Sequence, residues 1–161
     1  MLPLIVVLTV FTALRLAGAL GVSAVRDWRL CLRWALAVMF LITATAHWGA
    51  KRPDLVAMVP PAFPNPELLV TLTGIAEIAG ALGLMYARTS RLAAACLAVL
   101  LIAMFPANIH AAQQQLTLGG SPVTELPLRT FVQVGLIASA IAVAWRRRGG
   151  ETRTMEACAA H

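Results

Sequence analysis

Residues Leu68–Tyr86 read LLVTLTGIAEIAGALGLMY. These 19 residues are almost wholly apolar, and a helix of that length crosses the hydrocarbon core of a bilayer. Glu77 lies at the middle, where an ionised side chain costs about 2.5–3.5 kcal/mol on insertion scales and normally faces protein or a water-filled cavity. We therefore expect a helix central to a membrane bundle, with Glu77 directed inward. Glu77 is then either a functional carboxyl or a protonated side chain that makes one interhelical hydrogen bond.

Small side chains on this helix predict close approach of its neighbours, as is usual for helices packed in membranes. The small residues are Gly74, Ala76, Ala79, Gly80, Ala81 and Gly83.

The rest of the chain has the same character. Of its 161 residues 60% are hydrophobic and 12% charged, half the charged share of an average soluble domain. Four further stretches reach spanning length: Leu2–Leu20, Leu30–Trp48, Leu92–Ala112 and Pro127–Trp145. The sequence therefore predicts an all-α transmembrane bundle of five helices.

We expect three parts along the chain. Residues 1–24 form an extra N-terminal transmembrane helix, residues 25–148 a four-helix membrane domain, and residues 149–161 a flexible cytoplasmic tail. A cleaved signal peptide is the alternative for Leu2–Leu20, but this stretch lacks a basic leading region and contains Arg15. We therefore expect the first helix to be retained, with Arg15 reaching the membrane surface.

The connection Gly49–Glu67 has an unusual composition. Its prolines exclude a regular helix through it, yet many of its other residues are apolar, unlike an exposed linker. We expect it to fold back over the bundle as a lid or to lie in the membrane interface; a stiff connector is the alternative.

Basic residues lie mostly at helix ends and predict the orientation. Nine arginines fall on one side of a five-span topology: Arg26, Arg29, Arg33, Arg88, Arg91, Arg146, Arg147, Arg148 and Arg153. The other side has three cationic residues, Lys51, Arg52 and Arg129. The positive-inside rule then places the N-terminus outside and the C-terminus inside. The net charge of +6 is not arranged as a basic stripe with aromatics, so we expect no nucleic-acid partner.

Six polar residues fall in the outer half of the predicted bundle: His47, Glu77, Asn108, His110, Arg129 and Gln133. They predict a pocket open outward or laterally to lipid, with Glu77 at its floor as the catalytic or proton-exchanging group and the other five as ligand-binding residues. Arg129 suits an anionic or carbonyl group. We expect no metal, because the histidines and Glu77 lack the short spacing of a metal site.

Simpler roles stay open for most of these residues. Asn108 could satisfy the carbonyl freed by Pro106, both histidines could be interfacial, and Arg129 could reach a lipid phosphate.

The chain resembles the DoxX-like family of small bacterial membrane proteins over roughly residues 30–145. The resemblance rests on ATAHW, AMVPPAFPNPELLVTLTGIAEIAGALGL, MFPANIHAA and LPLRTFVQ. It implies a four-helix core, location in the bacterial cytoplasmic membrane, and motif positions at His47, Pro60, Glu77, Pro106, Asn108, His110, Arg129 and Gln133. The family takes its name from a subunit of a thiosulfate:quinone oxidoreductase, and relatives are linked to redox or maturation pathways.

These observations lead to a first hypothesis, an accessory subunit of a membrane redox system that binds a quinone-like or other amphiphilic ligand. No haem, flavin or iron–sulfur ligand pattern is present, so no cofactor is expected in the chain and electrons would come from a membrane redox partner protein. The alternatives are a proton-linked carrier of a small solute or lipid and a non-catalytic assembly factor. Whether the chain is an enzyme, and its oligomeric state, stay open.

Overall fold

The computed structural model describes residues 2–122 and 125–145, so the predicted tail 149–161 lies outside the described residues. The helices are α1 (Leu2–Ala19), α2 (Trp28–Ala44), α3 (Arg52–Met58), α4 (Pro66–Met85), α5 (Ser90–Ala103), α6 (Phe105–Gln113) and α7 (Leu126–Ala144). Two 3₁₀ turns, η1 (Ser23–Val25) and η2 (Thr45–His47), and a small hairpin of β1 (Thr117–Leu118) and β2 (Ser121–Pro122) complete it.

Five helical segments of the described chain are long and apolar enough to cross a membrane: α1, α2 with η2, α4, α5 with α6, and α7. The predicted class, an all-α membrane bundle of five spans, is confirmed. The α5–α6 span runs over 24 residues and is interrupted at Met104, because Pro106 starts a new helix in its first turn.

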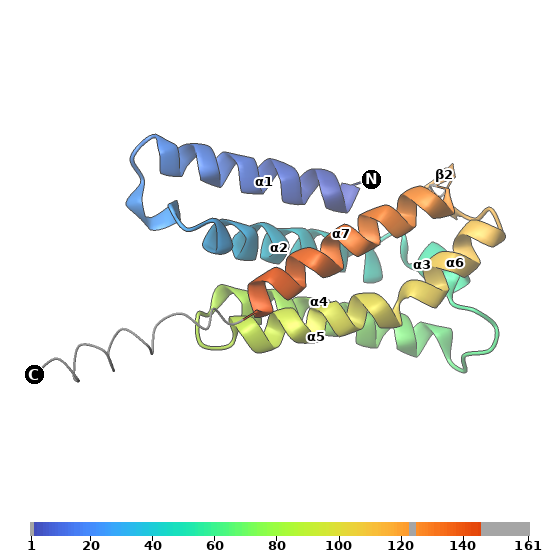
Figure 1. Ribbon diagram of the computed structural model, residues 1–161. Coiled ribbons are helices and arrows are strands. Elements are labelled where there is room, and N and C mark those ends of the chain that lie inside the picture. Colours follow the sequence, from blue (N-terminus) through green and yellow to red (C-terminus); the bar gives the residue numbers. More distant parts are fainter. Residues whose placement is uncertain (1, 123–124, 146–161) are drawn as a thin grey trace, which may run out of the picture.

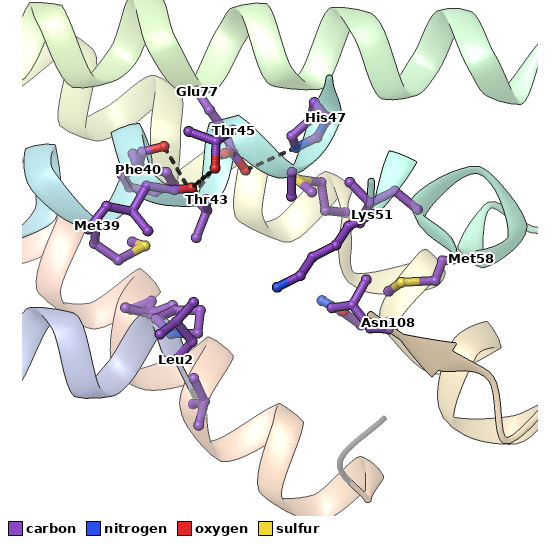
Figure 2. A pocket seen from close by; sticks show the side chains of 18 of the residues that line it. Leu2, Met39, Phe40, Thr43, Thr45, His47, Lys51, Met58, Glu77 and Asn108 are labelled. Atoms are coloured by element: carbon purple, nitrogen blue, oxygen red, sulfur yellow. Dashed lines mark hydrogen bonds and ion pairs between the residues drawn. The ribbon is translucent and has the colours of Figure 1, made fainter. Parts of the chain in front are cut away.

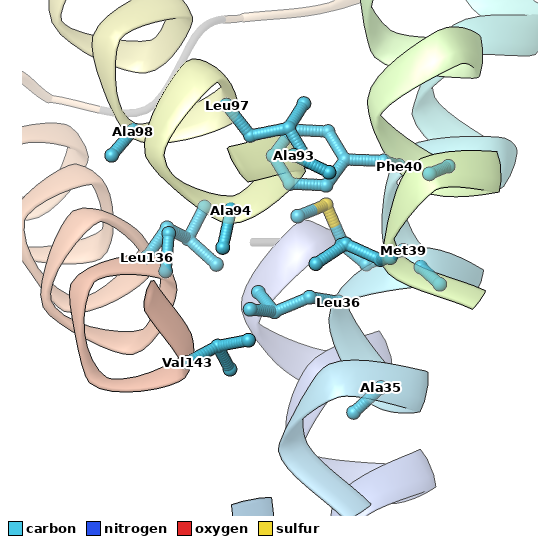
Figure 3. Packing of buried hydrophobic residues seen from close by; sticks show 14 of the residues in the cluster. Ala35, Leu36, Met39, Phe40, Ala93, Ala94, Leu97, Ala98, Leu136 and Val143 are labelled. Atoms are coloured by element: carbon cyan, nitrogen blue, oxygen red, sulfur yellow. The ribbon is translucent and has the colours of Figure 1, made fainter. Parts of the chain in front are cut away.

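The spans run side by side, with α1 along α2 at one side and α4 beside α5 at the other (Figure 1). The apolar core joins α2, α4, α5 and α7 through residues that include Leu36, Met39, Phe40, Leu97 and Leu136 (Figure 3). The most buried span is α2, with 44% of its residues inside, against 28% for α4. The prediction that α4 is the central helix was therefore wrong, because α4 packs mainly on α2 and α5 and keeps one face outward.

The first helix is peripheral. It packs chiefly on α2, and only 11% of its residues are buried. Gly18 allows α1 to approach η1, since a Cβ there would lie 2.7 Å from the carbonyl oxygen of Val25. Arg15 donates from Nη1 to the carbonyl of Arg26 at 2.7 Å, at the end of the helix where it was expected to reach the surface.

One face of α4 carries the small residues that its neighbours approach. A Cβ on Gly80 would lie 2.5 Å from Leu97 of α5, and one on Gly83 would lie 2.8 Å from Ala93. Ala81 is fully buried as well, but it lies about 100° round the helix from Gly80. Ala76 and Ala79 are exposed instead, so the prediction that all six small residues serve packing holds for only part of the set.

The connection between α2 and α4 folds back onto the bundle. The prolines were expected to exclude a helix through it, yet α3 forms within it because Pro53 occupies its first turn and Pro60 lies beyond its end. The helix packs on α4 and α6.

The hairpin between α6 and α7 is fastened to α3. Gly119 and Gly120 form its two-residue turn, with φ of 62° and 78°, as a turn of this hand requires. Asp54 on α3 accepts a hydrogen bond from the backbone N–H of Gly119 at 2.7 Å. We call α3, the α3–α4 connection and this hairpin the cap of the bundle.

Replacing Gly80 with leucine should destabilise the bundle by about 2 kcal/mol, because overpacking a tight contact typically costs 1–3 kcal/mol. Unfolding by sodium dodecyl sulfate in mixed micelles measures the change. Ala79→Leu is the matched control on the exposed face and should leave the free energy of unfolding nearly unchanged. Equal stability of the two variants would contradict the packing of α4 on α5 described above.

Candidate functional site

A cavity of about 850 Å³ lies beneath the cap, between α2, α4, α6 and α7. Five of the six predicted site residues line it: His47, Glu77, Asn108, Arg129 and Gln133. Leu2 and Pro3, at the start of α1, close one side. The structure therefore brings together side chains from four spans that are up to 86 positions apart in the sequence, from His47 to Gln133 (Figure 2).

Glu77 is 5% exposed and is held from α2. Its Oε2 lies 2.9 Å from the Thr43 hydroxyl, which is also 3.1 Å from the carbonyl oxygen of Phe40. A hydroxyl has one proton to donate and can accept as well. It can therefore donate to an ionised Glu77, or accept from a protonated Glu77 while it donates to Phe40. The contact accommodates both states of the carboxyl.

His47 lies beside Glu77 and is 4% exposed. Its Nδ1 is 2.7 Å from the carbonyl oxygen of Val70; because a carbonyl only accepts, Nδ1 carries a proton. The titrating atom is then Nε2, which faces Oε1 of Glu77 at 3.7 Å. Gly74 makes room for this imidazole, since a Cβ there would lie 2.7 Å from His47 Cβ.

The backbone around His47 is also fixed. Arg52 donates from Nη1 to the His47 carbonyl at 2.8 Å and from Nη2 to the Thr71 hydroxyl at 2.9 Å. This arginine therefore joins the end of α2 to α4 rather than facing the cavity.

Asn108 and Gln133 form a second polar contact, between α6 and α7. Asn108 Nδ2 donates to Gln133 Oε1 at 2.7 Å, and Gln133 Nε2 donates to the carbonyl of Leu101. Leu101 lies in the last turn of α5, just before the interruption of the span. Gln133 thus hydrogen-bonds to the backbone just before the interruption of the span. Asn108 bonds to Gln133 and not to a carbonyl freed by Pro106, which was the alternative role for it.

Arg129 lines the cavity with a buried N–H donor that lacks a hydrogen-bond partner in the described part of the chain. Its Nη1 is buried, and no acceptor among residues 2–122 and 125–145 lies within hydrogen-bonding distance. Lys51 also extends toward the cavity (Figure 2). Among the described residues lining the cavity, these two cations face a single carboxyl group, that of Glu77. The lining therefore has an excess of hydrogen-bond donors and of positive charge.

His110 does not line this cavity. Its Nδ1 lies 3.2 Å from the carbonyl oxygen of Met58, so it links α6 to α3. It follows Asn108 by two positions on the same helix, which turns it about 200° away from the face that Asn108 presents.

The cavity residues that were not among the sequence candidates include Thr43 and Lys51. Thr43 lies near the end of α2, four positions before His47 of η2, so helical spacing could have identified it. Lys51 enters the cavity because of the turn between η2 and α3, for which the sequence offers no periodic signal. Within the described parts of the chain, no group of three His, Cys, Asp or Glu side chains is placed to hold a metal ion.

Residues 36–144 match the family model described as a domain of unknown function, DUF8561. The chain belongs to the DUF8561 family. The DUF8561 match begins within α2 and ends with α7, so it includes all five cavity residues predicted from the sequence and leaves α1 outside. No curated protein and no solved structure matches the chain.

Thr43→Val should lower stability by about 1–2 kcal/mol, since it removes a hydroxyl partner from the buried Glu77 carboxyl. Thr43→Ser keeps the hydroxyl and is the control for the change in shape. Detergent unfolding of both variants provides the measurement. The contact would be unimportant if the valine variant proved as stable as the serine variant.

Proposed function

We propose that this chain binds an amphiphilic ligand with a carbonyl or anionic head in the cavity beneath the cap, with a quinone as the best-fitting class. The observation that carries the proposal is the buried Nη1 of Arg129, which finds no acceptor in the described part of the protein. A buried donor without a partner costs about 1–3 kcal/mol, so an oxygen of a ligand that accepts from it gains affinity.

The rest of the lining supports a ring-shaped, largely apolar head. Phe40, Leu101 and Val132 provide apolar surface, while Lys51 and Arg129 provide donors. The Glu77 carboxyl, which is accommodated in either protonation state, suits a ligand that exchanges protons. A quinone combines an apolar ring, carbonyl oxygens that accept hydrogen bonds, and the exchange of protons.

We further propose that the chain is an accessory subunit of a redox system in the bacterial cytoplasmic membrane. The resemblance to DoxX-like proteins supports this role, with a partner protein as the source of electrons. Nine arginines against three cationic residues support an orientation with the N-terminus outside, which puts the cap and the cavity in the outer half of the membrane.

Arg129→Gln should lose a ligand that copurifies with the wild-type protein. Native mass spectrometry in mild detergent, followed by extraction of the bound molecule, detects this ligand and gives its class. Arg88→Gln removes an exposed arginine beyond the end of α4 and should retain the ligand. Equal occupancy of the two variants, or a wild-type protein that copurifies empty and binds no added quinone, would contradict the proposal.

A proton-linked carrier is the second candidate, because His47 Nε2, Glu77 and Thr43 form a chain of proton-exchanging groups at the cavity wall. In this case Glu77→Gln should abolish proton-linked uptake of the copurifying compound into liposomes, with its retention in detergent unchanged. Thr43→Ser should keep the uptake. Uptake that survives in Glu77→Gln would exclude the carrier.

A further inference from the structure

A second cavity, of about 260 Å³, adjoins the first beneath the α3–α4 connection. Its walls come from that connection, α4 and α6, and are mostly apolar. They include Val59, Pro60, Phe63, Leu69, Val70 and Ala107.

The two cavities share a wall. Five residues line both cavities and form the boundary between them: His47, Leu55, Met58, Met104 and Asn108. Methionine is unbranched and has three rotatable bonds, which lets it move aside at little cost. The two methionines are therefore the side chains of this boundary that a chain-like molecule displaces most easily.

The polar side chains around the second cavity already have partners. The Thr73 hydroxyl is 2.9 Å from the Leu69 carbonyl oxygen, and His47 Nδ1 donates to the carbonyl of Val70. Asn108 Nδ2 donates to Gln133. The second cavity thus offers little to a polar solute or a water molecule, which needs two to four polar partners. The first cavity differs, because the buried Nη1 of Arg129 there finds no acceptor in residues 2–122 or 125–145.

We propose that the second cavity holds the hydrocarbon chain of the same ligand whose head lies against Arg129. The ligand is then an amphiphile with a single prenyl or alkyl chain. Its head binds to Arg129 and its chain lies beneath Phe63. This inference rests on the proposed function and specifies the class of its ligand. It also assigns Ala107 as a residue that determines chain acceptance, because Ala107 lines the second cavity and not the first.

The test compares two quinones on the purified full chain in detergent. Decylubiquinone has the ring and a ten-carbon chain, and 2,3-dimethoxy-5-methyl-1,4-benzoquinone has the ring alone. Ala107→Phe fills the second cavity, so it should weaken decylubiquinone binding at least tenfold and change binding of the ring compound less than twofold. Ala138→Phe, at an exposed position of α7, is the matched control and should bind both compounds like the wild type.

The outcomes separate the two proposals. Unchanged decylubiquinone binding by a folded Ala107→Phe overturns the chain site, while binding of the ring compound that depends on Arg129 still upholds the head site. Failure of the wild-type protein to bind either compound overturns both.

A second measurement does not depend on the folding of a variant. A decylubiquinone analogue with a diazirine at the chain end, photoactivated on the wild-type protein, should label peptides of the α3–α4 connection and of α6. Labelling confined to α1 and α7 would overturn the chain site, since it would place the chain at the side closed by Leu2 and Pro3.

Discussion

A carboxyl group in the middle of a membrane span must be surrounded by protein, and the arrangement of α2 against α4 meets this requirement. Thr43 of α2 and His47 of η2 lie four positions apart and both approach Glu77. Gly74 lets the imidazole come close enough, and the Val70 carbonyl fixes its tautomer. The position of α2 is therefore set by these polar contacts and by the adjoining apolar core of Leu36, Met39 and Phe40.

In the described lining of the cavity, two pairs of side chains hydrogen-bond to each other, and Arg129 has a buried donor without a partner. Glu77 with Thr43, and Asn108 with Gln133, hold four spans in register. Their hydrogen bonds are made within the protein, so they shape the space more than they attract a ligand. Arg129 is different, since its buried Nη1 has no acceptor in residues 2–122 or 125–145. Structural and recognition roles are thus divided between different side chains of one cavity.

The sequence was sufficient for the class of fold and for most of the cavity. Length and hydropathy identify spans, and depth along each span identified residues such as Glu77 and Gln133 that meet in space. The sequence predicted the wrong helix as the central one. Glu77 and its small neighbours pointed to α4, but α2 is more buried because it contacts α1, α4 and α7. His110 was predicted from its depth and from its motif position, and neither specifies the face of a helix. Lys51 could not be predicted, since its direction depends on an irregular turn.

The bond between Asp54 and Gly119 has a consequence for how this protein tolerates change. It joins two connections that are 65 positions apart, one before α4 and one before α7. Lys51 packs against the same glycine, with its Cε 3.0 Å from where a Cβ would lie. An insertion in either connection is therefore transmitted to the other. Exchanging a single loop with a related chain would leave a mismatched pair, whereas both loops exchanged together would form a transferable unit.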